Sequence, residues 1–227
     1  MKNTIQPSTI RPNDGDAIYN LLFAIRKLFF MAILFISGSA AAALEPGKDF
    51  KLLNPPQPAN TQKIEVLEFF FYGCSHCFHL HPHIAAWEKN MPKDVELVYV
   101  PVVFRDSWEP MARTFYALES LGQQHQLHDL LYKVWNVDNN VLNEESKVLD
   151  VIVPRGVDRA KFSAAYNSFS VQSKVTRSKQ MIRSYGITGT PALVVDGKYL
   201  ITGLQSEEYI RVLNEVIAMV RKARTKP

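Results

Sequence analysis

The chain has 227 residues, of which 47% are hydrophobic and 21% are charged, with 10 glycines, 13 prolines and 2 cysteines. This composition is typical of a globular protein and excludes intrinsic disorder, and two cysteines exclude a small scaffold held by many disulfides. The formal net charge is only +4, and the body of the chain has no basic run interleaved with aromatic residues, so we expect no nucleic-acid partner.

An apolar segment near the N-terminus has the order of a secretory signal peptide. A basic pair at 26–27 precedes the apolar run at 28–36, and small residues follow it up to Ala43. The run has about nine residues, short of the roughly twenty that span a bilayer, and three alanines at its end supply a cleavage pattern. We expect residues 1–43 to be removed on export, which leaves a mature chain with no stable membrane insertion. An uncleaved membrane anchor is the alternative.

Both cysteines of the chain stand in the motif Cys74-Ser75-His76-Cys77, directly after a β-rich run at 63–72. The sequence predicts a buried strand, then this C-x-x-C motif, then a helix that begins at the motif. A helix N-terminus favours an anion because its backbone N–H groups are unpaired. We therefore expect Cys74 to be exposed with a lowered pKa, and Cys77 to be covered and to act as the resolving thiol. His76, when charged, would stabilise the thiolate further. A purely structural disulfide clip is the alternative.

Four of the six histidines lie at or next to this motif, at positions 76, 79, 81 and 83. A metal site built on them competes with the redox interpretation. On a helix, His76, His79 and His83 share one face while Cys77 and His81 share another, so one tetrahedral site cannot use them all. The sequence also has no second C-x-x-C. We expect no bound metal, and we expect the last three histidines to lie on a solvated helix face.

The middle of the chain predicts a second strand followed by a helical block. Residues 96–104 are typical of a buried strand, and the order strand, helix, strand favours a right-handed parallel crossover. Strand patterns then vanish over 108–185, and we expect this block to be an insertion with an apolar core of its own. Phe115, Trp135 and Phe169 are predicted to belong to that core. Further helices are expected at 145–153, at 158–166 with Asp158 as N-cap, and at 171–185.

Strand patterns return near the C-terminus. Runs at 191–195 and 198–201 flank Asp196-Gly197, which is typical of a two-residue hairpin turn. A helix over 206–222 closes the chain, because its apolar residues recur at helical spacing.

Together these features resemble the DsbA family of exported thiol–disulfide oxidoreductases in the thioredoxin superfamily. The resemblance is carried by the export segment, the run Val66–Phe70 ahead of the C-x-x-C, the helical block, and Gly189–Ala192 ahead of the hairpin. It implies an α/β thioredoxin fold with an inserted all-helical domain. The parts would be a signal peptide at 1–43, thioredoxin-like residues 44–107, the helical insertion 108–185 and thioredoxin-like residues 186–227.

The resemblance also implies which residues form the site. Cys74 and Cys77 would be the redox disulfide, and the Thr190–Pro191 peptide bond would be cis and would face the two sulfurs. We expect Thr190, Pro191 and Ser75 to contact the substrate. Ser75 departs from the family, which commonly has proline at this position, so the redox potential of the disulfide cannot be carried over from the family.

Glu68 is a carboxylate inside an apolar run, where burial would raise its pKa. By resemblance it would accept a proton from Cys77 when a mixed disulfide is resolved. The alternative is a half-exposed residue on an edge strand. The strand predicted at 96–104 has no lysine, so the charged partner that many relatives place near the buried acid cannot be carried over.

The expected reaction is thiol–disulfide exchange. A substrate thiolate would attack Cys74 of the Cys74–Cys77 disulfide, and the second thiol of the substrate would then release the reduced protein. The substrates would be unfolded exported proteins with free cysteines, in the periplasm. By resemblance, a quinone-linked membrane oxidase of the DsbB kind would restore the disulfide, and no cofactor is expected. There are two alternatives: a disulfide isomerase or reductase with the same site, and a periplasmic metal carrier that uses the cysteines and histidines.

Overall fold

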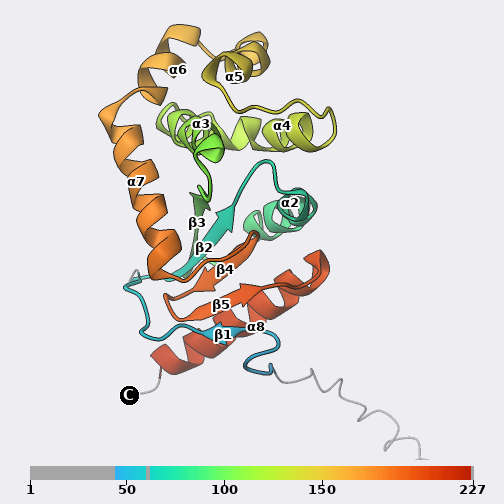
Figure 1. Ribbon diagram of the computed structural model, residues 1–227. Coiled ribbons are helices and arrows are strands. Elements are labelled where there is room, and N and C mark those ends of the chain that lie inside the picture. The colour runs from blue at the N-terminus through green and yellow to red at the C-terminus, as the bar shows by residue number, and fades with distance from the viewer. Residues whose placement is uncertain (1–43, 60–61, 226–227) are drawn as a thin grey trace, which may run out of the picture. The chain divides into compact units, whose positions relative to one another are not determined.

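A five-stranded sheet in the order β1-β5-β4-β2-β3 forms the centre of the fold (Figure 1). The structure is a computed structural model that describes residues 44–59 and 62–225, so the predicted signal peptide lies outside the described residues. Strands β2 and β3 are parallel, and the other neighbouring strands are antiparallel. The strands are β1 (Lys51–Leu52), β2 (Ile64–Phe70), β3 (Val95–Pro101), β4 (Ala192–Val195) and β5 (Tyr199–Thr202).

Helices cover both faces of this sheet and extend beyond one end of it (Figure 1). Helices α2 and α8 contact each other, and α8 also contacts β2, β4 and β5, whereas α7 packs against β3. Within the described ranges, no helix is both long and apolar enough to span a membrane. The helices are α2 (Ser75–Glu88), α3 (Glu109–Ser120), α4 (Gln124–Asn136), α5 (Glu145–Ile152), α6 (Arg159–Tyr166), α7 (Phe169–Ser184) and α8 (Ser206–Arg224), with 3-10 turns η1 (Asp106–Trp108) and η2 (Val153–Arg155).

Side chains of the central strand β2 alternate between the two faces of the sheet. Val66 and Phe70 pack in the same buried cluster as the apolar residues of α2 and α8. Leu67 and Phe69 pack in a second cluster with residues of α7. By this alternation, position 68 points to the face that α2 and α8 cover.

The helical insertion has no core of its own, so that prediction is wrong. Phe115 of α3, Leu131 of α4 and Val148 of α5 belong to a single buried cluster that also contains Val66 of the sheet and Leu213 of α8. The apolar faces of α3 and α4 contact β3 and α2, respectively. One continuous core therefore connects the insertion to the helix that carries the cysteines.

Two local predictions fail for identifiable reasons. Strand β3 ends at Pro101 rather than at residue 104, because its partner β2 ends at Phe70, whose carbonyl oxygen accepts a last hydrogen bond of 2.7 Å from the N–H of Val102. Phe169 is 86% exposed and not core. It lies two positions before the buried Val171, which places it near the opposite face of α7. Phe115 is buried as predicted, and Trp135 is half-buried against the same core.

Predictions that depend on local chemistry are confirmed. Asp158 is the N-cap of α6, where its side chain accepts a hydrogen bond of 2.8 Å from the backbone N–H of Lys161. Asp196 and Gly197 turn the β4–β5 hairpin with φ values of 55° and 62°. A Cβ at Gly197 would also collide with the carbonyl oxygen of Gln57, so only glycine fits there.

Candidate active site

The C-x-x-C motif lies at the junction of β2 and α2, where Cys74 is the N-cap of the helix. The two cysteines are free thiols in the structure. The backbone N–H of Cys77 donates to the Cys74 Sγ at 3.4 Å, and the Cys74 thiol donates to the carbonyl oxygen of Thr190 at 3.3 Å. The first sulfur is thus held between the first turn of α2 and the loop before β4.

The surroundings of Cys74 favour its thiolate. The hydrogen bond from the Cys77 thiol lowers the pKa of Cys74 most, and hydrogen bonds from the Thr190 side chain and from the backbone N–H groups of Cys77 and His76 add to it. They outweigh the partial burial of the sulfur and bring the pKa from 9.0 to about 5. Cys74 is therefore mostly ionised at neutral pH.

Cys77 has the opposite environment one turn further along α2. Its side chain is fully buried, and burial raises its pKa well above 9.0, with a further rise from the hydrogen bond to Cys74 and the charge there. Cys74 is half-buried rather than exposed as predicted, and Cys77 is covered. Cys74 can react with molecules from solvent, whereas Cys77 can react only with a group already at Cys74.

Gly73 allows the insertion to approach the reactive sulfur closely. A Cβ at this position would lie 2.5 Å from the Phe71 ring and 2.7 Å from the Trp135 indole. Phe71 in turn stacks on Trp108 with ring centroids 3.8 Å apart. The rings of Trp108 and Trp135 from the insertion, together with Phe71, therefore pack next to the C-x-x-C motif.

The loop at Thr190 and Pro191 is fixed from the side opposite Cys74. The Thr190–Pro191 peptide bond is cis, as predicted. The Tyr209 hydroxyl donates to the carbonyl oxygen of Pro191 at 2.9 Å and accepts from the backbone N–H of Gly203 at 3.0 Å. The Thr202 hydroxyl also lies 3.4 Å from the Pro191 carbonyl oxygen. These bonds hold the loop next to the sulfur.

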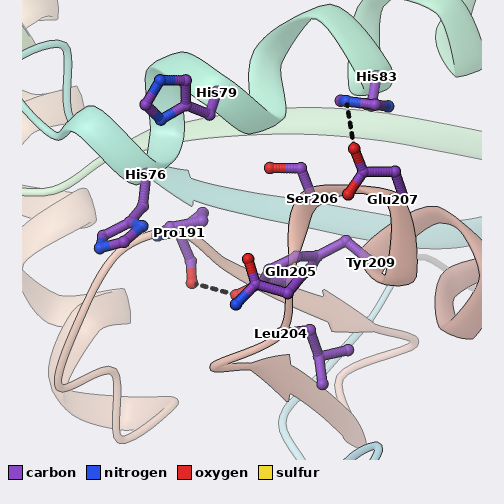
Figure 2. A pocket seen from close by; sticks show the side chains of 9 residues that line it. All are labelled: His76, His79, His83, Pro191, Leu204, Gln205, Ser206, Glu207 and Tyr209. Carbon is purple, nitrogen blue, oxygen red and sulfur yellow. Dashed lines mark hydrogen bonds and ion pairs between the residues drawn. The ribbon is translucent and has the colours of Figure 1, made fainter.

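A polar pocket of about 340 Å³ lies beside this loop, between α2 and the start of α8 (Figure 2). The imidazoles of His76, His79 and His83 line its α2 side, so these three histidines share one helix face as the spacing predicts. His83 forms an ion pair with Glu207 of α8, with 3.9 Å between the two atoms. The remaining lining residues are Pro191, Leu204, Gln205, Ser206 and Tyr209.

Ser75 is exposed at the first position of α2, and His76 beside it is exposed too. Both are accessible to a chain that approaches Cys74. His76 contributes to the lowered pKa of that cysteine through its backbone N–H. In the described part of the chain, no group of three or more His, Cys, Asp or Glu residues is arranged to hold a metal ion.

His81 is buried, so the prediction of a solvated surface histidine is wrong for this position. Helix α4 of the insertion covers its face of α2, and the His81 Nε2 is hydrogen-bonded to the Asp129 carboxylate. His128 and Tyr132 from the same helix pack against the His81 ring. The sequence did not indicate His128, Asp129 and Tyr132 as neighbours of His81, because α2 and α4 are far apart along the chain. The hydrophobic pattern of each helix does not show which helix it contacts.

Glu68 is completely buried on the central strand, so the alternative of a half-exposed edge residue is wrong. Its neighbour across the parallel ladder is Tyr99. Neither carboxylate oxygen has a hydrogen-bond partner among the described residues. Burial, with a smaller effect from Glu88, raises the pKa of Glu68 from 4.5 to about 8. Glu68 therefore holds its proton at neutral pH.

Comparison with known proteins decides the family. Residues 65–212 match the family model described as a DSBA-like thioredoxin domain. The chain belongs to the DsbA family. It is 39% identical to the thiol:disulfide interchange protein DsbA of Burkholderia cepacia over 166 residues, which cover 72% of this chain and 78% of that protein. It is 34% identical to DsbA of Pseudomonas aeruginosa over 176 residues, covering 77% and 83% of the two chains.

Solved DsbA structures agree with this assignment. The crystal structure of Pseudomonas aeruginosa DsbA matches with a TM-score of 0.78 at 32% identity, covering 82% of this chain and 99% of that one. DsbA from Xylella fastidiosa matches with a TM-score of 0.74 at 28% identity, covering 79% and 98%. The thioredoxin fold with a helical insertion is thereby confirmed, and the chain is a thiol:disulfide oxidoreductase of the DsbA family.

Proposed function

We propose that the chain donates its Cys74–Cys77 disulfide to other proteins. The observation that carries this proposal is the ionised, accessible Cys74 sulfur beside the buried Cys77 thiol. A substrate thiolate attacks Cys74, the bond between the two cysteines breaks, and Cys77 leaves with the electron pair and takes up a proton. The second thiolate of the substrate then attacks the substrate sulfur of the mixed disulfide. This releases an oxidised substrate and the reduced protein.

The low pKa of Cys74 supports this direction of transfer. A thiolate that is stable at neutral pH is a good leaving group, and its stability favours the reduced form of the protein over the disulfide. A protein that is stable when reduced passes its disulfide on and acts as an oxidant. An isomerase or reductase also needs an ionised Cys74 as its nucleophile, so the discriminating property is how strongly the thiolate favours the reduced form of the protein.

The residues around the sulfur suit an extended substrate chain. Thr190 and Pro191 would offer backbone groups to that chain in the manner of an added strand, and Ser75 lies exposed at the same rim. His76 would stabilise the thiolate whenever its ring is charged. Glu68 would exchange a proton with Cys77, since the two groups lie on the same buried side of the sheet.

Family membership supports a location and a partner. The substrates would be unfolded exported proteins with free cysteines, in the periplasm, after removal of the segment at 1–43. A quinone-linked membrane oxidase of the DsbB kind would return the reduced protein to its disulfide form. The metal carrier stays the weaker candidate, because the histidines near the motif divide between a pocket face and a buried position.

Trapping of mixed disulfides tests the assignment of the two thiols. Cys77→Ser should accumulate covalent complexes with exported proteins, because a partner bound at Cys74 can no longer be released by the second thiol of the site. Cys74→Ser is the matched control and should trap none. Complexes that accumulate with Cys74→Ser instead would reverse the two roles. The equilibrium constant with glutathione should show that the Cys74–Cys77 disulfide is easily reduced. A disulfide that resists reduction by glutathione would favour a reductase function instead.

A further inference from the structure

A group of buried polar atoms without hydrogen-bond partners surrounds the interior side of the active site. Over residues 44–59 and 62–225, these atoms are both carboxylate oxygens of Glu68, the Nδ1 of His81, the Nε2 of His128 and the hydroxyl of Tyr132. A buried polar atom left without a partner costs about 1–3 kcal/mol, so a cluster of five is not explained by stability. The established role of the two cysteines uses none of the last three residues.

These residues form one continuous cluster. The His81 ring lies 4.7 Å from the His128 ring and 5.0 Å from the Tyr132 ring, measured between centroids, and His128 lies 5.2 Å from Tyr132. The Tyr72 hydroxyl is hydrogen-bonded to the Nδ1 of His128 at 2.7 Å. Two imidazoles and two phenols thus stand in mutual contact.

The inner end of the cluster reaches the reacting groups. Burial raises the pKa of Tyr132 most, and the charges of Cys77 and Glu68 raise it further, so its hydroxyl lies in the electrostatic field of both. The charge of Glu68 also acts on Tyr72. The Tyr132 ring also lies 6.5 Å from the ring of Phe78, the residue after Cys77, and 6.1 Å from the ring of Phe70 on β2, measured between centroids. Tyr132 is therefore the member of the cluster that connects to the active site.

The outer end of the cluster reaches solvent. His81 is hydrogen-bonded through Nε2 to Asp129, whose side chain is 85% exposed. A cavity of about 390 Å³ lies at this end and is lined by both histidines of the cluster and by Asp129. A cavity of this size has room for several water molecules at roughly 30 Å³ each, and the polar side chains in its lining can bind them. The charged or titratable groups that face it are His81 and Glu88 from α2, Lys89 directly after α2, Tyr99 from β3, and His125, His128 and Asp129 from α4.

We propose that Tyr132, His128 and His81 form a proton relay between Glu68 and the surface at Asp129. This inference rests on the proposed function, because it completes the proton balance of the exchange at Cys77. When the disulfide opens, the Glu68 carboxyl gives its proton to the departing Cys77 sulfur and becomes a carboxylate. A proton from solvent then enters at Asp129, passes through the cavity to the two histidines that line it, and reaches the carboxylate through the tyrosine.

Each member of the relay has the protonation state that transfer requires. The Nε2 of His81 is hydrogen-bonded to the Asp129 carboxylate, and its Nδ1 has no hydrogen-bond partner among the described residues. Burial, with the neighbouring His81 and His125, lowers the pKa of His128 well below 6.5, so this ring is neutral. When its Nδ1 donates to the Tyr72 hydroxyl, its Nε2, which has no partner among the described residues either, is an acceptor. A hydroxyl such as that of Tyr132 both donates and accepts.

Tyr132→Phe is the sharpest test, because it removes only a hydroxyl that bonds to nothing among the described residues. The rate at which dithiothreitol opens the disulfide would be followed by acid quenching and thiol alkylation, across pH and in H2O and D2O. We expect this variant to open about tenfold more slowly with a larger solvent isotope effect, which is less than the roughly 10²–10⁴-fold of a general acid or base that acts directly on the reacting group. Its thermal stability should be unchanged or higher, since the buried hydroxyl has no partner to lose.

Two further variants complete the design. Asp129→Asn changes an exposed carboxylate at the outer end and should also slow the reaction, by about threefold, with the pH profile shifted. Tyr116→Phe is the matched control, because it removes a buried insertion hydroxyl that is bonded to Ser178 at 2.6 Å and lies outside the cluster, and it should leave the rate unchanged.

The outcomes separate this inference from the proposed function. A Tyr132→Phe rate within twofold of the unaltered protein, or a slower rate with the isotope effect and pH profile unchanged, would overturn the relay. If Glu68→Gln is slow in that case, Glu68 draws its proton by another route and the proposed function stands. An unaltered protein whose Cys74 alkylates but whose disulfide does not exchange with thiols would overturn the proposed function and the relay together.

Discussion

Replacing Glu68 with glutamine should stabilise the protein, and the gain should depend on pH. Burial raises the pKa of Glu68 from 4.5 to about 8, so the folded protein keeps this proton over a pH range in which the unfolded chain has lost it. The free energy of unfolding therefore falls as the pH rises from about 4.5 to about 8. Glutamine has nearly the same shape and stays neutral, so it removes this loss.

The size of the effect follows from the pKa. Each pKa unit corresponds to about 1.4 kcal/mol, so at neutral pH the buried carboxyl costs about 3 kcal/mol, and above pH 8 about 5 kcal/mol. Because the Glu68 side chain has no solvent exposure, no reduction for screening applies. Glu68→Gln should recover this amount at neutral pH and about nothing near pH 4, where both states are protonated.

Urea unfolding of the reduced protein from about pH 4 to pH 9 measures this prediction. Glu65→Gln is the matched control on the same strand, since Glu65 is only half-buried and Arg177 opposes the rise in its pKa. Its effect should be smaller. If Glu68→Gln were no more stable at pH 8 than the unaltered protein, or if its stability kept the same pH dependence, Glu68 would not be the buried proton holder described above.

Three further predictions concern the motif and the loop beside it. Cys74 should alkylate with a midpoint near its pKa of about 5 in a rate-versus-pH measurement, while the second thiol stays unreactive in the folded protein; equal rates would refute the assignment. Gly73→Ala should lower the free energy of unfolding by about 1–3 kcal/mol in urea, because its Cβ would collide with the Trp135 indole. An unchanged stability would mean that the indole shifts to make room for the Cβ. Tyr209→Phe should lower it by about 1 kcal/mol and weaken peptide binding beside Pro191 in calorimetry, and unchanged binding would show that this hydroxyl does not fix the loop.

The sequence could predict those features that are decided by a few neighbouring residues. The N-cap at Asp158, the turn at Asp196-Gly197 and the cysteine at the start of α2 depend on local chemistry that any fold would preserve. Cys74 is less buried than Cys77 because it is the N-cap at the end of α2, whereas Cys77 lies one turn inside the helix, where the surrounding elements cover it.

Other features depend on contacts between distant segments, and these the sequence could not show. His81 belongs to a histidine-rich stretch that has no apolar pattern, and only the packing of α4 on α2 buries it. The shared core of the insertion and the sheet is equally invisible, since amphipathic helices have the same pattern whether they pack on each other or on a strand. Tyr99 as the neighbour of Glu68 follows from the register of β2 and β3, which periodicity does not determine.

The tyrosine at position 99 has a direct consequence for the chemistry of the buried acid. A lysine ammonium opposite a carboxylate would lower the pKa of that carboxylate, because an opposite charge favours the ionised form. With Tyr99 there instead, burial is the largest effect on Glu68 and keeps it protonated at neutral pH. The site is thus divided: Cys74 on the solvent side is ionised, and Glu68 and Cys77 on the inner side hold protons. Opening of the disulfide moves a negative charge toward the inner side, and a proton held there neutralises it without bringing a counter-ion into the core.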